Sequence, residues 1–85
     1  MIKGIILPKP AEKKLRNLPK NIRKKFWDLL ERLIDDPNYP ALRNKKIKGT
    51  RGDWEFSITM NYRATYKIER ENLVIINIGK HEDVF

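Results

Sequence analysis

Two runs of alternating character, Trp54–Met60 (WEFSITM) and Tyr62–Ile68 (YRATYKI), decide the fold of this chain. In each run the apolar residues stand two positions apart, which places them on one face of a strand and the polar residues on the other. The apolar set comprises Trp54, Phe56, Ile58, Met60, Tyr62, Ala64, Tyr66 and Ile68. One buried face is typical of antiparallel sheets, so the sequence predicts two adjacent antiparallel strands.

The connection between these strands is constrained by the alternation itself. A two-residue turn at Met60-Asn61 would place Thr59 opposite Tyr62 and would set a polar face beside an apolar one. Because a shift of one residue exchanges the faces, matching them requires an odd-numbered loop or a bulge. With that geometry, one polar surface of the sheet is predicted to contain Ser57, Thr59, Arg63, Thr65 and Lys67.

Three further segments complete the predicted sheet. Leu73–Ile78 (LVIINI) is apolar on both faces, which predicts the most buried strand, and Lys80–Phe85 follows as a short tail. Lys45–Gly49 (KKIKG) is predicted to be a short edge strand whose lysines oppose aggregation. Ile2–Leu7 is predicted to be an N-terminal strand that ends at a proline.

Two stretches between these strands have apolar residues at helical spacing. The first stretch, before Pro19, carries Ala11, Leu15 and Leu18. The second carries Ile22, Phe26, Leu30 and Leu33 on one face. It should end at Asp36-Pro37, because a residue that precedes proline is forced out of the helical region. Trp27 lies off this stripe and is expected to be exposed.

The fold class is therefore predicted to be α+β, with residues 1–85 forming a single domain. The expected order is an N-terminal strand, a helical hairpin and then an antiparallel β-meander. The helices should pack on one face of the sheet and leave the other face polar and basic.

The composition favours an anionic partner. The chain has 85 residues, a net charge of +8, a pI near 9.9 and no cysteine. Nucleic acid is the commonest partner of so basic a domain, and the alternatives are an acidic protein or a surface that is charged only for solubility. The chain shows no signal peptide and no membrane span, so a cytoplasmic protein is expected.

Three motifs resemble a known family. They are the basic segment Lys46–Gly49 (KIKG), the strand segment Tyr62–Tyr66 (YRATY) and the closing segment Ile78–Phe85 (IGKHEDVF). Their order within so short a chain resembles the RelE/ParE toxin superfamily of type II toxin–antitoxin systems. The resemblance implies a cognate antitoxin protein as a partner, and operator DNA bound through the antitoxin complex. It also implies either of two targets, namely mRNA on the ribosome or DNA gyrase.

Metal-independent RNA cleavage requires stabilisation of the phosphorane charge and two proton transfers. Arg63 fits the first task because a guanidinium is permanently charged and grips two phosphate oxygens, and it matches the strand arginine of the family. The alternative role is a surface arginine paired with Glu55 or Glu69. His81 is the only histidine and matches the tail position where the family carries His or Arg, so it is the candidate for proton transfer.

The remaining candidates are for RNA binding or for structure. Phosphate contacts are predicted for Lys46, Lys48, Arg51 and Lys67, and base stacking for Phe85. Edge protection for Lys46 and a place in the sheet for Phe85 are the alternatives. Tyr62 and Tyr66 are interpreted as core residues. Glu55 lies on the polar face near Lys67, where it is either a base or a structural partner of that lysine, and the structural role is favoured. No metal-ligand spacing is present, and no cofactor is expected.

The chain also departs from its family. Some branches carry His at the position of Ser57 and Asp near Asn61, and others end in Tyr where Phe85 stands. The leading interpretation is a ribosome-dependent mRNA endoribonuclease. The alternatives are a non-enzymatic gyrase inhibitor, and a degenerate toxin that binds only its antitoxin and operator DNA.

Overall fold

The five strands of the protein form one mixed sheet. A computed structural model describes residues 2–84. The strands are β1 (Gly4–Ile6), β2 (Lys45–Lys46), β3 (Trp54–Ser57), β4 (Tyr62–Glu69) and β5 (Asn72–Lys80). Their order is β1-β5-β4-β3-β2, with β1 parallel to β5 and every other neighbouring pair antiparallel. The predicted α+β class with an antiparallel meander is confirmed, and the parallel pairing of β1 makes the sheet mixed.

The β3–β4 hairpin has the odd-numbered loop that the alternation requires. Ser57 lies opposite Arg63, and the Tyr62 carbonyl accepts a hydrogen bond of 2.9 Å from the Ile58 N–H. Residues 59–61 therefore connect the strands, and both apolar faces point the same way. The prediction that Met60 shares the apolar face is wrong. Its side chain is 74% exposed, because β3 ends at Ser57 and Met60 belongs to the loop.

A bulge in β5 overturns the prediction that Leu73–Ile78 is the most buried strand. Thr65 pairs with Asn77 and Tyr66 pairs with Ile75, so Ile76 has no opposite residue in β4. The extra residue points Ile76 outward, where it is 41% exposed. The buried side chains of this strand are Leu73, Ile75 and Ile78.

Two predicted strands are shorter than expected. β1 covers Gly4–Ile6 only, and β2 ends at Lys46 because the chain turns immediately afterwards. The Ile47 N–H donates to the Asp53 carbonyl over 2.8 Å, and the two glycines of the turn, Gly49 and Gly52, have φ of 83° and 90°. Such backbone is incompatible with a strand, so residues 47–53 form a closed loop.

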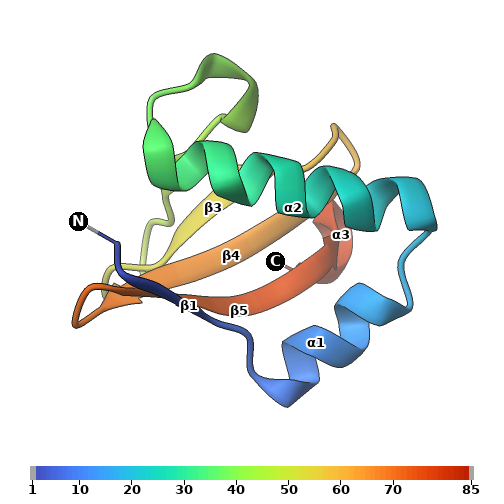
Figure 1. Cartoon of the computed structure of the whole chain (residues 1–85), viewed down its shortest axis with the longest axis horizontal. Coiled ribbons are helices and arrows are strands. Elements are labelled where there is room, and N and C mark those ends of the chain that lie inside the picture. Colours follow the sequence, from blue (N-terminus) through green and yellow to red (C-terminus); the bar gives the residue numbers. More distant parts are fainter. Residues whose placement is uncertain (1, 85) are drawn as a thin grey trace.

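The helices α1 (Lys9–Arg16) and α2 (Lys20–Asp35) confirm the predicted hairpin. Figure 1 shows α2 running across the sheet and α1 lying beside β5. Phe26 of α2 stacks on Phe56 of β3, with ring centroids 6.0 Å apart. Trp27 is exposed, as its place off the apolar stripe predicts. The α2 residues that enter the core are Ile22, Phe26, Leu29, Leu30 and Leu33.

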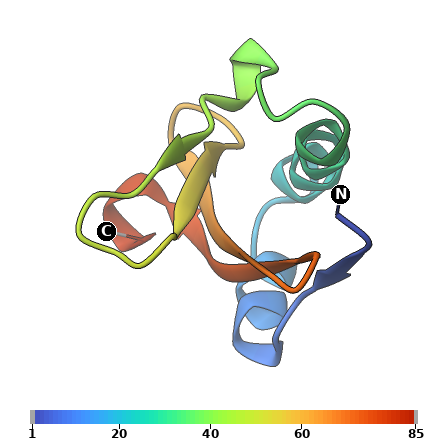
Figure 2. The ribbon, with the colours of Figure 1, turned by 90° about the vertical axis from the view of Figure 1, so that its left-hand side faces the viewer.

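Two short helices remain, and one of them shapes the second side of the sheet. The 3₁₀ helix η1 (Pro40–Leu42) buries Leu42, and α3 (His81–Val84) follows β5 directly. Figure 2 shows α3 and the 47–53 loop on one side of the sheet and α2 on the other. The side away from α2 is thus only partly open, and Arg63 lies on that side.

Candidate functional site

Arg63 is held in a fixed place on the side of the sheet away from α2. It lies on β4 between Ser57 of β3 and Gly79 of β5. Its Nη1 donates to the Ser57 Oγ over 2.6 Å, and its Nη2 donates to the Met60 carbonyl over 3.1 Å. The Arg63 Nε is buried and has no hydrogen-bond partner. The alternative pairing of Arg63 with Glu55 or Glu69 is therefore wrong, and a permanent positive charge is oriented by uncharged groups.

His81 lies at the same end of β4 and β5 as Arg63. It is exposed and begins α3, and its backbone N–H donates to the Asn61 carbonyl over 2.8 Å. Gly79 is opposite Arg63, and His81 follows only two residues later, roughly 7 Å further along the strand direction. The hairpin loop and the end of β5 thus place the backbones of the two candidate catalytic residues at the same end of the sheet.

A buried carboxylate lies on the same face as Arg63, two residue pairs further along the β3–β4 ladder. Glu55 is only 2% exposed, and its Oε1 is 3.0 Å from the Nζ of Lys45, which lies opposite it on β2. Its Oε2 is buried without a hydrogen-bond partner. The structural interpretation of Glu55 is supported, but its predicted partner is wrong. Lys67 instead lies 3.1 Å from Glu69.

The predicted polar surface is less open than expected. Ser57 and Thr65 are 6% and 5% exposed, although both lie on the polar side of their strands. α3 and the 47–53 loop lie on this side (Figure 2), and neither could be placed over the sheet from the alternation of β3 and β4. The polar face is therefore a partly covered site with Arg63 at its edge.

The predicted RNA-binding residues are dispersed. Lys48 and Arg51 are exposed on the 47–53 loop, on the same side of the sheet as α3 (Figure 2). Lys46 pairs with Trp54, so its side chain leaves β2 on the face opposite to that of Lys45 and Glu55. Lys67 is four residues from Arg63 on β4, a separation of about 13 Å. Phe85 lies outside the described residues.

Sequence reasoning missed two partners that shape this site. It placed Ser57 on the face of Arg63 without pairing them, although the odd-numbered loop that it required sets them opposite each other. It also missed the Asn61 carbonyl, which fixes the start of α3. The signal for Asn61 in the sequence was weak. Continuing the β4–β5 pairing one step beyond Tyr62 and Lys80 sets Asn61 opposite His81, and nothing else in the sequence indicates this contact.

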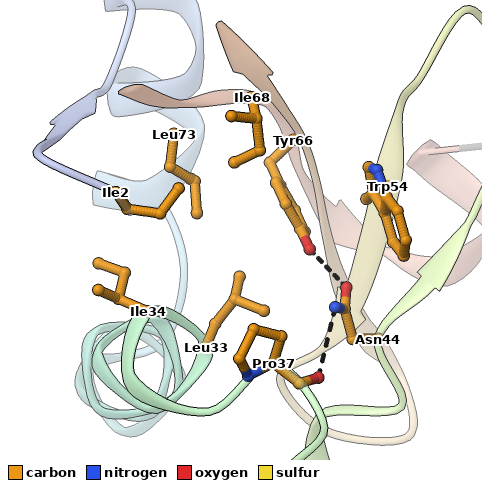
Figure 3. A pocket seen from close by; sticks show the side chains of 9 residues that line it. All are labelled: Ile2, Leu33, Ile34, Pro37, Asn44, Trp54, Tyr66, Ile68 and Leu73. Atoms are coloured by element: carbon orange, nitrogen blue, oxygen red, sulfur yellow. Dashed lines mark hydrogen bonds between the residues drawn. The ribbon is translucent and has the colours of Figure 1, made fainter. Parts of the chain in front are cut away.

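A separate apolar cavity of about 230 Å³ lies on the α2 side of the sheet, and Figure 3 shows its lining. The Tyr66 hydroxyl donates to the Asn44 Oδ1 over 2.5 Å, and the Asn44 Nδ2 donates to the Pro37 carbonyl over 3.4 Å. Burial raises the pKa of Tyr66 to about 12, although the hydrogen bond to Asn44 opposes the shift. Tyr66 is a core residue, as predicted, and Tyr62 is half-buried against the core.

Two classes of site find no support in the part of the chain that the structure describes. No group of three His, Cys, Asp or Glu residues gathers there as a metal site. No helix within the same residues is long and apolar enough to cross a membrane.

Comparison with known proteins identifies a family over almost the whole chain. Residues 5–85 match the family model described as the ParE toxin of the type II toxin–antitoxin system parDE. No curated protein sequence matches the chain.

Solved structures resemble the fold at low sequence identity. YafQ from E. coli strain BL21(DE3) superposes with a TM-score of 0.81 at 16% identity, covering 100% of this chain and 99% of that one. A metal-bound toxin from Helicobacter pylori gives 0.81 at 22% identity, covering 100% of both chains. A chain of the RelB–RelE antitoxin–toxin complex from Methanococcus jannaschii gives 0.75 at 20% identity, covering 93% of both.

Proposed function

We propose, from the premise that this chain belongs to the ParE toxin family of type II toxin–antitoxin systems, that it is an endoribonuclease that cuts mRNA on the ribosome. The observation that carries the proposal is the placement of Arg63 beside the start of α3. Its guanidinium is oriented by Ser57 and the Met60 carbonyl, and His81 follows two residues after the glycine opposite Arg63.

The chemistry assigned to these residues is transfer of the phosphoryl group to the neighbouring 2′-oxygen. The 2′-oxygen attacks the phosphorus and the bond to the 5′-oxygen breaks, which gives a 2′,3′-cyclic phosphate and a 5′-hydroxyl. One proton leaves the 2′-hydroxyl and another is added to the 5′-oxygen. His81 carries out one of these transfers, and solvent or a ribosomal group carries out the other.

Arg63 stabilises the negative charge that grows on the phosphorane oxygens. Beyond the N–H groups that bind Ser57 and Met60, Nη1 and Nη2 each keep one further N–H, whereas the Nε–H is buried. A donor that is already oriented does not have to reorganise when charge develops, which is why such donors accelerate reactions. Lys48 and Arg51 lie on the same side of the sheet and hold the RNA through its phosphates.

An antitoxin is the proposed partner that neutralises the toxin in the cytoplasm, and the complex is proposed to bind operator DNA. A solved structure with this fold is itself a complex named as antitoxin and toxin, which supports this assignment.

Gyrase inhibition is the second candidate function, because the matching family model is that of ParE toxins.

The test is to expose translating ribosomes on a defined mRNA to the purified chain and to map the new RNA ends. Cleavage that leaves 2′,3′-cyclic phosphate ends, and that is lost in Arg63→Ala, would support the proposal. Intact mRNA together with inhibition of supercoiling by purified gyrase would establish the second candidate. Intact mRNA and uninhibited gyrase, with a folded protein, would leave only a binding function.

A further inference from the structure

Nearly all the net charge of this protein lies on one short segment. Residues 9–25 contain eight lysines and arginines but a single acid, Glu12, so the segment carries +7. The other 68 residues contain eleven basic and ten acidic side chains, a net charge of only +1. The segment comprises α1, the link to α2 and the first turns of α2. The proposed cleavage site is therefore not where the charge of the molecule is concentrated.

This charge is exposed and largely unneutralised. Seven of the eight basic residues of the segment are exposed, and Arg23 is half-buried. Within the described residues, its one ion pair is a long contact of 3.7 Å between Arg16 and Glu12, and Lys14 bonds the neutral Asn77. Lys20 and Lys24 stand one helical turn apart, where like charges repel.

The start of α2 also opposes its own helix dipole. The first turn of α2 contains Lys20 and Arg23 and no acidic residue, although the N-terminus of a helix carries partial positive charge and favours anions. Residues that destabilise the local structure in this way, such as basic side chains at a helix N-terminus, are concentrated at functional surfaces. The segment therefore has the electrostatic character of a site for a polyanion.

A hollowed surface connects this segment to the candidate site. One groove is lined by Lys14, Pro19, Tyr62 and Lys80 among others, and so joins the α1–α2 link to the ends of β4 and β5. A second groove shares Tyr62 and Lys80 with the first and continues to His81. Because the two grooves have Tyr62 and Lys80 in common, they adjoin each other, and together their linings extend from Lys14 of the basic segment to His81, the residue proposed for proton transfer.

We propose that residues 9–25 and the groove at Lys80 form a track for the phosphate backbone of RNA that leads to the cleavage site. An acidic protein fits this surface less well, because residues 9–25 contain no exposed large hydrophobic side chain, and Trp27 is the one such side chain elsewhere on α2 within the described residues. Protein interfaces depend on such apolar anchors, whereas phosphate binding depends on Lys and Arg alone. The choice of RNA over DNA rests on the proposed function.

The test compares two variants that each lower the net charge from +8 to +5. Lys9→Gln/Lys13→Gln/Lys24→Gln removes charge from the track. Lys3→Gln/Arg43→Gln/Arg70→Gln removes it from exposed positions outside the track. The probe is a 2′-O-methyl RNA oligonucleotide, which binds but cannot be cut, so the outcome does not depend on catalysis. Binding is measured over a series of salt concentrations.

The track variant should bind the RNA at least about 10-fold more weakly at low salt. Its logarithmic salt slope should fall by up to about 2, since each phosphate that is no longer neutralised removes roughly 0.7. The matched variant should be weakened much less. A third variant, Lys9→Arg/Lys13→Arg/Lys24→Arg, should bind as the parent does, which separates loss of charge from loss of folding.

Equal weakening in the two charge-lowering variants, or unchanged binding in the track variant, would overturn the proposal. Equally tight binding of polyglutamate of the same length would overturn the assignment to RNA.

Discussion

The Ser57 hydroxyl lies 2.6 Å from the Nη1 of Arg63, directly across the β3–β4 pair. The serine is 6% exposed, so this hydrogen bond is shielded from solvent. A hydrogen bond to a charged group contributes about 1.5–3 kcal/mol. Ser57 therefore fixes the direction of the guanidinium, although it does not itself touch the reacting atoms.

Replacing Ser57 with alanine should lower the cleavage rate by roughly 10- to 100-fold, the factor that corresponds to this energy. The loss should be in kcat, because Arg63 keeps its charge and its affinity for phosphate. Thr65→Val is the matched control. It also removes a buried hydroxyl from this face of the sheet, but the Thr65 hydroxyl makes no side-chain hydrogen bond within the described residues. Rates are measured on the ribosome-bound substrate. An equal loss in both variants would show that burial, not the hydrogen bond to Arg63, is responsible.

Arg63→Ala and His81→Ala should each lower cleavage by about 10²–10⁴-fold through lost charge stabilisation and lost proton transfer. Both variants should keep the folded circular dichroism spectrum. Growth arrest on induction should disappear with the activity. If His81→Ala stays fully toxic while Arg63→Ala does not, a group other than His81 carries out the proton transfer.

The 47–53 loop should contribute more to RNA affinity than β2 does. Lys48→Ala/Arg51→Ala should flatten the salt dependence of binding by roughly 1.4, at about 0.7 for each phosphate that is no longer neutralised. Lys46→Ala should change it little, because Lys46 leaves its strand on the opposite face. Fluorescence anisotropy at several salt concentrations separates the two variants. A larger effect from Lys46 would mean that RNA crosses the edge of the sheet and not the loop.

The pair of Lys45 and Glu55 should be coupled in stability. Lys45→Met alone leaves a buried carboxylate without its cation and should destabilise the protein by about 1–2 kcal/mol, less than a fully buried pair would lose because Lys45 is exposed. Adding Glu55→Gln should recover most of this free energy of unfolding. Urea denaturation of the parent, both single variants and the double variant measures the coupling. Strict additivity of the two changes would show that the 3.0 Å ion pair does not contribute.

Alternation in the sequence predicts the β3–β4 hairpin closely because every one of its consequences is local. The required odd-numbered loop places Ser57 opposite Arg63, and it could have yielded their hydrogen bond as well. The bulge at Ile76 could not be foreseen, because LVIINI is apolar throughout and has no alternation to break. The burial of Glu55 could not be foreseen either, because its partner Lys45 lies on β2. In addition, α3 and the 47–53 loop cover this face, and both come from distant positions in the sequence.

Alkaline pH should destabilise the protein through Tyr66, whose hydroxyl lies in the apolar surroundings of Figure 3. Burial raises its pKa in the folded state to about 12, whereas the ordinary value is 10.0. Between these values the unfolded chain loses the phenolic proton and the folded chain retains it. The free energy of unfolding must therefore fall as pH rises through this range. Two pKa units correspond to an upper limit of roughly 3 kcal/mol. The contribution is complete below about pH 10 and is gone above about pH 12.

The Tyr66→Phe variant tests this prediction, because it keeps the ring and removes the ionisation. Its free energy of unfolding should fall less over the same pH range. The lysines ionise in both proteins, so their effect cancels in the comparison. Urea denaturation at about pH 9, 10 and 11 gives the comparison. Parallel curves for the two proteins would show that the Tyr66 phenol ionises equally in the folded and unfolded chain.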